Sequence, residues 1–381
     1  MAKKRVLLVT SKYPYSKKEA DGGMTTAASV IESLKIDYNL DILFVRRFSK
    51  DESNIDGVRA IYFEEIKNKS QNKYERRIFN YKQVSQKILE LEKDYDFIVI
   101  IHASKAFGLE CAPDRVLNKI ILYPMFMSFA YRESGEIVPI IYDELEESTM
   151  RAIKWFVCPS KFDKDKIIEH YDLKNGSFYV IPRSVTKYID HSPRNKRKGF
   201  TILSIGNIKE RKQPLVLLNI FKKIKEQFHS SKLLFAGEIQ DIDLYNQCLN
   251  FIQDNNMKEC VSFLGTVSQK QIGKLIKISD INVCTSNFET FGRCVFEGMY
   301  GGLPTVVFDK LTCVKEFVKQ GEGIVFATDE NDFYQAMISL LTDENKYVRF
   351  SNEAIEATKF ISFETEKETL LRALKQIGGS I

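Results

Sequence analysis

Short apolar runs alternate with helical patterns along the whole chain of 381 residues. Most of these runs are continuously apolar, as in parallel strands that are buried on both faces. Regular alternation of strand and helix predicts an α/β protein with two doubly wound parallel sheets, and the length is sufficient for two domains. The predicted strands are 6–10, 41–45, 97–101, 120–123, 155–158 and 178–181 in the first half, and 201–205, 232–236, 261–264, 281–284, 305–308 and 323–327 in the second.

A polar, basic stretch separates the two halves. Residues 191–199 contain a proline, a glycine and four cations, which is typical of a linker between domains. We therefore place an N-terminal domain at 1–190, a C-terminal domain at 199–360 and a final helix within 361–381. Ligands in doubly wound folds bind at the carboxyl ends of the strands, here in the cleft between the domains. The clearest helical periodicity falls at 24–34, 81–91, 214–228, 269–278 and 331–341.

Two carboxylates, Glu289 and Glu297, are separated by seven residues between two predicted strands. The order strand, loop, helix and strand puts Glu289 in the loop and Glu297 inside the helix. The N–H groups at the start of that helix suit a phosphate, so one crevice would hold a diphosphate with a carboxylate on each side. In the alternative interpretation, Glu289 caps the helix and Glu297 is a solvated helix residue. The residues at the helix start are Thr290, Phe291 and Gly292.

A basic turn follows the predicted strand 201–205. Gly206 opens it, and cations at Lys209, Arg211 and Lys212 precede a helical pattern. A glycine turn with three cations ahead of a helix is chemically suited to a diphosphate, although a basic surface turn is the other interpretation. We refer to residues 206–213 as the basic turn.

The segment 285–307 resembles the Glu-x7-Glu signature of the family-4, GT-B glycosyltransferases, which retain the anomeric configuration. Its order S-x-x-E-T-F-G-x-x-x-x-E-x-M-x-x-G-x-P-x-V matches that signature. Residues 235–238, 263–267 and 313–323 resemble the A-G-x, F-L-G-x-V and E…G-x-G segments of the same family. The resemblance covers about 200–360 well and the first half in outline. It implies the GT-B fold, in which two Rossmann-like domains face each other across a deep cleft and the last helix crosses back to the first domain.

The resemblance also implies roles for individual residues. Lys212 would grip the leaving diphosphate, Glu289 would hydrogen-bond the transferred sugar, and Glu297 would bind the ribose hydroxyls. Glu289 and Lys212 would thus be the catalytic residues. The full set of implied substrate-binding residues is Gly22, Gly23, Gly206, Arg211, Lys212, Gly237, Val267, Glu289, Thr290, Phe291, Gly292 and Glu297.

The sequence departs from the family pattern at two positions. Asn207 stands where an arginine is common, and Arg211 or Lys209 would replace that cation. Many members carry a histidine after a first-domain strand, but the loop 124–129 has none. His102, which follows another predicted strand, would either face the cleft or be a hydrogen-bonded strand-end histidine.

These observations predict a retaining glycosyltransferase that uses a nucleotide-diphosphate sugar. We expect no metal ion, because the sequence shows no clear metal-ligand cluster. The seven cysteines have no close spacing, which indicates reduced, packed thiols in a cytosolic protein and no zinc site. The alternative is a catalytically silent GT-B module that binds a partner protein or a glycan, as the missing histidine and Asn207 would allow. A Rossmann dehydrogenase is excluded because no Gly-x-Gly-x-x-Gly follows the first strand.

Positive charge is concentrated in the first half. Residues 1–200 hold 35 Lys and Arg against 28 Asp and Glu, whereas 201–381 hold 21 against 23. The basic stretch 67–77, interleaved with Tyr74, Phe79 and Tyr81, would lie on an anionic membrane or form a solvated helix face. No nucleic-acid motif accompanies the charge. We expect a cytoplasmic protein, peripheral on the inner face of the cell membrane, that extends a lipid-linked glycan in bacterial surface polysaccharide synthesis.

Overall fold

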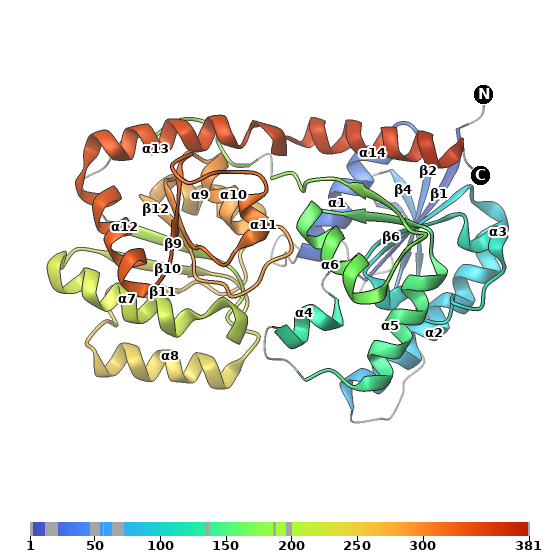
Figure 1. The fold of residues 1–381 in the computed structure, drawn as a ribbon, viewed down its shortest axis with the longest axis horizontal. Coiled ribbons are helices and arrows are strands. Elements are labelled where there is room, and N and C mark those ends of the chain that lie inside the picture. The colour runs from blue at the N-terminus through green and yellow to red at the C-terminus, as the bar shows by residue number, and fades with distance from the viewer. Residues whose placement is uncertain are drawn as a thin grey trace. The chain divides into compact units, whose positions relative to one another are not determined.

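The structure is a computed structural model whose described residues fall into two compact units (Figure 1). The first unit holds the described residues up to Pro182 together with those from Glu364 onward, and the second holds Arg183–Phe363. The residues that the structure describes are 3–11, 22–45, 54–55, 57–62, 72–125, 127–133, 137–185, 188–195 and 200–379.

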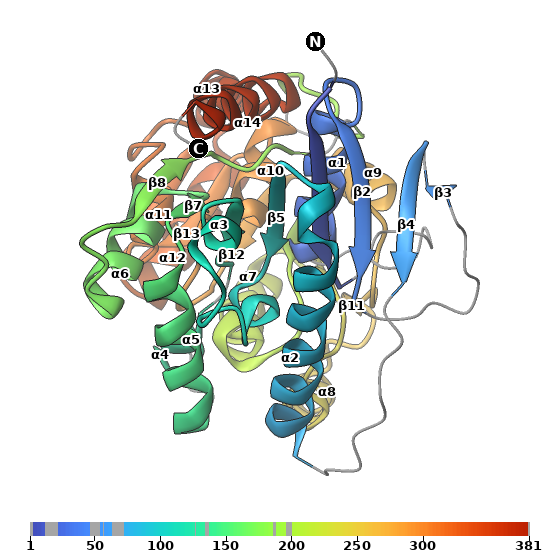
Figure 2. The same ribbon diagram turned by 90° about the vertical axis from the view of Figure 1, so that its right-hand side faces the viewer.

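The first unit is built on an eight-stranded sheet in the order β3-β4-β2-β1-β5-β6-β7-β8. All neighbouring strands are parallel except β3 and β4. Figure 2 shows the edge of this sheet that ends in β4 and β3. The strands are β1 (Arg5–Thr10), β2 (Asn39–Phe44), β3 (Asn54–Ile55), β4 (Val58–Tyr62), β5 (Phe97–Ile101), β6 (Ile120–Tyr123), β7 (Trp155–Cys158) and β8 (Ser177–Val180).

One face of this sheet is covered by α1 (Gly22–Leu34) and by the last helix, α14 (Phe363–Gly378). Ile31 of α1 and Leu374 of α14 share a buried core with strand residues, so residues from both ends of the chain complete one unit. Ser29 Oγ also donates a hydrogen bond to the Glu366 carboxylate at 2.6 Å. The remaining helices of the unit are α2 (Lys73–Leu91), α3 (Asp114–Leu117), α4 (Ser128–Glu133), α5 (Ile140–Ala152) and α6 (Lys161–Tyr171).

The second unit is built on a six-stranded parallel sheet in the order β11-β10-β9-β12-β13-β14. Successive strands run outward from β9 on one side and from β12 on the other, so the strand order reverses between these two. Ligands of open α/β sheets bind at such a switch point, outside the carboxyl ends of the strands. The strands are β9 (Thr201–Ile205), β10 (Lys232–Ala236), β11 (Val261–Phe263), β12 (Ile281–Cys284), β13 (Thr305–Phe308) and β14 (Ile324–Ala327).

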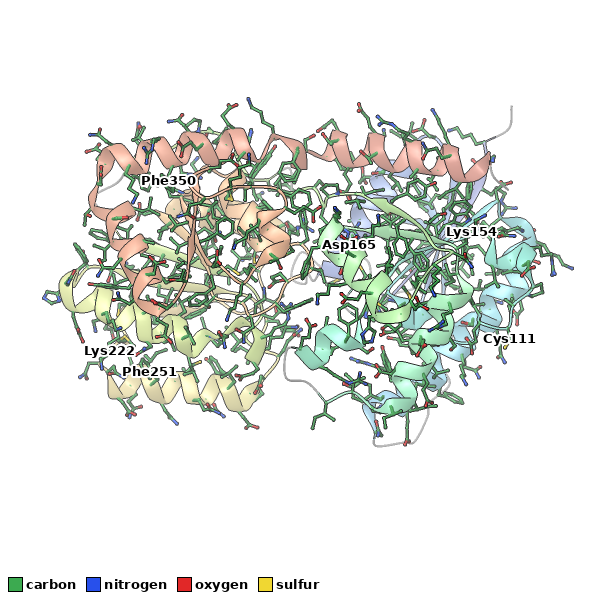
Figure 3. The ribbon with its side chains drawn as sticks, in the orientation of Figure 1. Cys111, Lys154, Asp165, Lys222, Phe251 and Phe350 are labelled. Carbon is green, nitrogen blue, oxygen red and sulfur yellow. The ribbon has the colours of Figure 1, made fainter. Side chains whose placement is uncertain are left out.

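Helices cover both faces of the second sheet. The buried residues of α7, α8 and α12 form one core with the strands, and α9 and α10 contact β9, β12 and β13 from the other face (Figure 1). Phe350 of α13 is buried in the same core, and Phe251 of α8 is partly buried against the surface of this core; both are labelled in Figure 3. The helices are α7 (Pro214–Gln227), α8 (Ile242–Asp254), α9 (Gln269–Ile278), α10 (Arg293–Tyr300), α11 (Thr312–Lys315), α12 (Glu330–Thr342) and α13 (Glu344–Ala357).

The predicted α/β fold class is confirmed. All twelve predicted strands are present, each shifted by no more than two residues at either end. The sequence did not predict β3 and β4, because β4 is a partly buried strand near the sheet edge in which Arg59 interrupts the apolar pattern. Within the described residues, no helix combines the length and the hydrophobicity that are needed to span a bilayer.

The basic, aromatic stretch that begins α2 differs from its prediction. We expected Tyr74 and Tyr81 to accompany the cations on a membrane-facing or solvated surface. Tyr74 is instead buried against Tyr142, and Tyr81 packs edge-on against Phe107. Tyr74 therefore belongs to the interior of the first unit, and Tyr81 is partly buried against the same cluster.

Candidate functional site

The loop between β12 and α10 places Glu289 at the carboxyl edge of the second sheet. The strand ends at Cys284 and the helix begins at Arg293. Gly292, just before the helix, has a φ of 81°, and a Cβ at this position would lie 2.7 Å from the side chain of Val314. Only glycine meets both conditions without strain, which explains the Phe-Gly step ahead of the helix.

Glu289 forms ion pairs with two cations from a distant part of the sequence. Its Oε1 accepts a hydrogen bond from Lys212 Nζ at 2.6 Å and another from Arg211 Nη1 at 2.8 Å. The same Arg211 nitrogen donates to the carbonyl oxygen of Phe288 at 2.9 Å. The three charged side chains are between 12% and 15% exposed, so their charges compensate one another with little help from water. The structure thus brings together three of the residues that the sequence assigned to one site.

The protonation states of this group follow from burial and pairing. Burial raises the pKa of Glu289, but the charges of Arg211 and Lys212 outweigh it and lower that pKa to about 2. Burial lowers the pKa of Lys212, but its neighbours Cys294 and Glu289 outweigh burial and raise that pKa above the ordinary value. Of these two groups only Glu289 is charged, because the hydrogen bond that Cys294 donates to Cys284, together with burial, raises the pKa of the Cys294 thiol and keeps it neutral. At neutral pH Glu289, Arg211 and Lys212 therefore carry one negative and two positive charges. Beside them, the hydrogen bond from Cys294 lowers the pKa of the Cys284 thiol to about 6.

Two hydrogen bonds hold the basic turn against the β12–α10 loop. Thr285 Oγ1 donates to the carbonyl oxygen of Lys212 at 2.9 Å, and the N–H of Asn287 donates to the carbonyl oxygen of Arg211 at 2.8 Å. They fix the backbone from which both cationic side chains reach the carboxylate. Sequence analysis missed Thr285 and Asn287, whose only signal is their position between a predicted strand and the first carboxylate.

The ends of β9 and β10 approach so closely that only glycine fits at Gly237. A Cβ there would lie 2.2 Å from the carbonyl oxygen of Gly206 and 2.7 Å from the nitrogen of Asn207. The Asn207 side chain accepts a hydrogen bond from the N–H of Glu238 at 3.1 Å. Asn207 therefore fastens the basic turn to the neighbouring strand end, and Arg211 is the cation that stands beside the lysine.

We expect Gly237→Ala to lower the free energy of unfolding by about 1–3 kcal/mol, because the added methyl group must push the basic turn away from β10. Gly265→Ala is a matched control. Gly265 has a φ of 64°, but its Cβ would meet nothing within 4 Å, so this variant carries only backbone strain, about 1 kcal/mol. Urea unfolding followed by circular dichroism measures both variants. A smaller loss for Gly237→Ala than for the control would contradict the steric explanation.

Glu297 lies in the second turn of α10 and is only 4% exposed. Its Oε1 accepts a hydrogen bond from Arg293 Nε at 3.1 Å. Burial raises the pKa of Glu297, and the neighbouring Arg293 opposes the rise. This burial contradicts the alternative in which Glu297 is a solvated helix residue. Glu289 is not the N-cap residue of the helix either, because Gly292 is, and the Glu289 carboxylate pairs with Arg211 and Lys212 instead.

The first turn of α10 presents backbone N–H groups at the same edge of the sheet. The N–H of Val295 bonds the carbonyl oxygen of Gly292 at 2.9 Å. In the part of the chain that the structure describes, the N–H groups of Arg293 and Cys294 have no acceptor. Such groups, with the positive end of the helix dipole, suit an anion. The residues predicted for this role, which immediately precede the helix, are Thr290, Phe291 and Gly292.

Cys284 and Cys294 meet beside Lys212, although they are ten residues apart in the sequence. Their sulfur atoms are 3.8 Å apart, and Lys212 Nζ lies 3.8 Å from Cys294 Sγ. The thiols are free, as predicted, and a strand end and a helix start bring these two together although they are not closely spaced in the sequence. With Glu289 they form the one group of described residues whose ligand atoms, within 4.8 Å of one another, suit a metal ion. The ammonium of Lys212 already contacts two members of that group.

The other predicted positions lie outside this cluster. Gly22 and Gly23 begin α1 in the first unit. Val267 follows β11 in the second unit, and its side chain is buried. His102 follows β5 with a φ of 87°, and its Nδ1 hydrogen-bonds Ser104 Oγ at 2.8 Å. Burial lowers its pKa well below the usual value, so it is a neutral, hydrogen-bonded strand-end histidine, the second of the two interpretations.

Comparison with known proteins adds an independent line of evidence. Residues 186–357 match the family described as glycosyl transferases group 1. The chain is 23% identical over 242 residues to mannosylfructose-phosphate synthase of Agrobacterium fabrum, a match that covers 59% of this chain and 51% of that protein. It is 26% identical over 236 residues to UDP-Gal:alpha-D-GlcNAc-diphosphoundecaprenol alpha-1,3-galactosyltransferase of Escherichia coli, covering 58% and 59%. The chain thus spans about half the length of the curated relatives it matches.

Similarity to solved structures extends over the whole chain. Sucrose-phosphate synthase from Thermosynechococcus elongatus matches with a TM-score of 0.84 at 14% sequence identity, and the match covers 99% of this chain and 100% of that one. A match at so low an identity shows the fold alone. It includes the first unit, for which the sequence offered only an outline.

Proposed function

Because residues 186–357 belong to the glycosyl transferases group 1 family and the chain has the GT-B fold, we propose that the protein transfers a sugar from a nucleotide-diphosphate sugar to a glycan or lipid-linked glycan, with retention of anomeric configuration. The observation that carries this proposal is the convergence of Arg211 and Lys212 on Glu289 at the switch point of the second sheet. Cations placed there compensate the charge of a departing diphosphate, and the carboxylate beside them holds the sugar.

In the proposed step, the bond between the anomeric carbon and the diphosphate oxygen breaks. The acceptor oxygen bonds to the same face of that carbon, and its proton passes to the leaving diphosphate, so no protein base is required. Lys212, Arg211 and the N–H groups at the start of α10 stabilise the negative charge as it develops. Glu289, which its pKa of about 2 keeps ionised, accepts hydrogen bonds from the sugar hydroxyls.

We propose that this transfer needs no metal ion. A divalent cation at Cys284, Glu289 and Cys294 would have to displace the Lys212 ammonium, which lies 2.6 Å from the carboxylate oxygen. That ammonium is itself a fixed positive charge next to the proposed diphosphate position. The role that a metal ion has in other phosphate sites, neutralising charge on the leaving group, is thus assigned to a side chain.

We expect one nucleoside diphosphate from a panel of the common bases to raise the melting temperature in the presence of a chelator, and Glu297→Ala to abolish that rise. The Glu297 carboxylate would hold the ribose hydroxyls through its two acceptor oxygens. Ligand at a hundred times its dissociation constant stabilises a protein by about 2.7 kcal/mol, which is readily measured. Glu356→Ala serves as control, because Glu356 is a 67% exposed residue of the same unit.

The binding panel also separates the proposed activity from its alternative. With the nucleotide identified, its sugar conjugates are tested for transfer, and the anomeric configuration of the first-formed product is read by NMR. Inversion at the anomeric carbon would contradict the proposed retention. No thermal shift with any nucleotide, in a well-folded protein, would favour the catalytically silent module that binds a partner or a glycan.

The choice of acceptor rests on the relatives. The galactosyltransferase from Escherichia coli acts, by its name, on a sugar linked to diphosphoundecaprenol, and a relative from Bacillus subtilis is named poly(glycerol-phosphate) alpha-glucosyltransferase. These names support the proposal that this chain also extends a surface glycan on a lipid-linked acceptor. A lipid-linked acceptor would bring the protein to the inner face of the cell membrane as a peripheral protein.

A further inference from the structure

Three isoleucines around the start of α5 lie on the surface of the first unit. Ile137 is 90% exposed, Ile140 is 74% exposed and Ile141 is 52% exposed. Ile137 lies two residues before the N-cap Pro139, and Ile140 and Ile141 are the first two residues of the helix. We refer to them as the isoleucine patch. The other exposed large apolar residues of the described chain occur singly along the sequence: Ile36, Leu89, Tyr188, Ile242, Leu249, Leu264 and Ile278. A grouped exposure indicates an interaction surface, whereas single exposed residues need no explanation.

The residues next to the isoleucine patch are packed into the interior of the first unit. Val138 and Tyr142, each next to a patch residue in the sequence, are 7% and 2% exposed and share a buried cluster with Tyr74 and Phe107. The Tyr74 hydroxyl donates a hydrogen bond to the carbonyl oxygen of Ile137 at 3.0 Å. The Tyr74 and Tyr142 rings pack edge to face with centroids 5.5 Å apart. Because the neighbouring residues are fixed inward, the isoleucines are held outward rather than exposed by a loose helix end.

Cations of α2 accompany the patch. The Arg77 guanidinium lies 5.8 Å from the ring centroid of Tyr74, the residue bonded to the patch. In the sequence, 67–77 carries five Lys and Arg against one Glu, and the structure describes this stretch from residue 72 onward. Asp143 of α5 is paired with Arg132, so its charge is compensated. Among the side chains described at the start of α2, Arg76 and Arg77 thus outnumber Glu75.

We propose that the isoleucine patch inserts into the surface of an anionic lipid bilayer, with Arg76 and Arg77 at the headgroups. An apolar group accompanied by cations is the combination that binds such a surface. Glu144, exposed one turn farther along α5, limits the apolar contact to the start of the helix. The inference rests on the proposed function, because a lipid-linked acceptor requires the protein to work at a membrane, and it adds the surface that makes the contact.

Flotation with lipid vesicles tests the proposal without donor or acceptor, so its outcome is independent of sugar transfer. We expect the wild-type protein to float with vesicles that contain phosphatidylglycerol. The triple variant I137S/I140S/I141S should partition at least tenfold less, because three isoleucine side chains no longer leave water. Ile36→Ser is the matched control, since Ile36 is 60% exposed in the same unit, and it should partition like the wild type.

The charge contribution has its own test. Arg76→Gln and Arg77→Gln should each lower partitioning by about fivefold at low salt, the effect of one cation near an anionic surface. Wild-type protein that stays off the vesicles, or a triple variant that binds like the wild type, would overturn the proposal. Equal binding to vesicles of phosphatidylcholine alone would overturn the part of the proposal in which anionic lipids are required. If analytical ultracentrifugation shows a dimer for the wild type and a monomer for the triple variant, the patch binds a second copy of the chain instead, and the proposal is overturned. The nucleotide-binding panel is unaffected by each of these outcomes.

Discussion

Replacing Lys212 with glutamine is expected to lower the rate of sugar transfer by about 10²- to 10³-fold. Removing one preorganised group that stabilises developing charge has this effect in other enzymes. The Lys212 ammonium is held 2.6 Å from Glu289 and its side chain is 15% exposed, so solvent would not replace its charge at the proposed diphosphate position. The loss should appear in kcat more than in the binding of the nucleotide, because in the proposed site Arg211 and the start of α10 would still contact the ground-state phosphates. Steady-state kinetics with the identified donor measures both quantities.

A second ion-pair group in the chain provides the control. In the first unit, Glu92 is 2% exposed and pairs with Lys119 at 2.9 Å and with Arg115 at 3.0 Å, the same arrangement of one carboxylate with a lysine and an arginine. Lys119→Gln therefore removes the same kind of contact away from the proposed site. Both variants keep an arginine on the buried carboxylate, so both should remain folded. Retained transfer in Lys212→Gln, or an equal loss in Lys119→Gln, would refute the assigned role of Lys212.

The strands were predictable from the sequence because most are buried on both faces. All five residues of β5 and all four of β12 are buried, and such continuous apolar runs are easily recognised. The strands β3 and β4 lie at the sheet edge, where partial solvent exposure allows Arg59 within a strand and removes the signal. The polar first half of α2 was missed for a related reason. Its helical start depends on the Asn72 cap, which accepts from two backbone N–H groups, rather than on an apolar face.

The charged cluster was predictable only in part. The sequence motifs identified Glu289 and Lys212. The structure adds that one carboxylate oxygen of Glu289 accepts hydrogen bonds from both Arg211 and Lys212. The contact between Cys284 and Cys294 depends on how α10 sits on β12. Gly298 permits this approach, since a Cβ there would lie 2.4 Å from the Asn282 side chain, whose amide donates to the carbonyl oxygen of Cys294. Such packing is set by pairs of residues distant in sequence, which a single sequence does not reveal.

Glu289→Gln is expected to lower the free energy of unfolding by about 3 kcal/mol at neutral pH. The pKa of Glu289 is about 2 in the folded protein, against about 4.3 for a free glutamate. A carboxyl group whose pKa is lowered by folding stabilises the folded state at every pH above its unfolded pKa. The two values together correspond to about 3 kcal/mol. Glutamine keeps the size of the side chain but leaves Arg211 and Lys212 without the negative charge that compensates them.

The pH dependence distinguishes this electrostatic effect from a packing defect. As the pH falls through about 4 toward 2, protonation of Glu289 in the unfolded chain removes the stabilisation of the wild type. The difference between wild type and Glu289→Gln should therefore shrink, with more than half of it gone by about pH 3. Urea unfolding of both proteins between pH 6 and pH 3 measures this change. A difference that stays constant over this range would show that the substitution disturbs packing rather than charge.

Glu297→Gln is the contrasting variant, since the two carboxylates differ in the sign of their pKa shifts. Burial raises the pKa of Glu297, and a carboxyl group whose pKa is raised by folding destabilises the folded state at neutral pH. That penalty fades as the pH falls and both states become protonated. Replacing Glu297 with glutamine removes the buried charge, so the substitution should cost little at pH 7. A loss as large as that of Glu289→Gln would mean that Arg293 compensates Glu297 as fully as the basic turn compensates Glu289. The contributions of the two buried glutamates to the free energy of unfolding are thus expected to change in opposite directions with pH. This difference fits the proposed roles, in which Glu289 is paired with two cations and Glu297 binds uncharged hydroxyl groups.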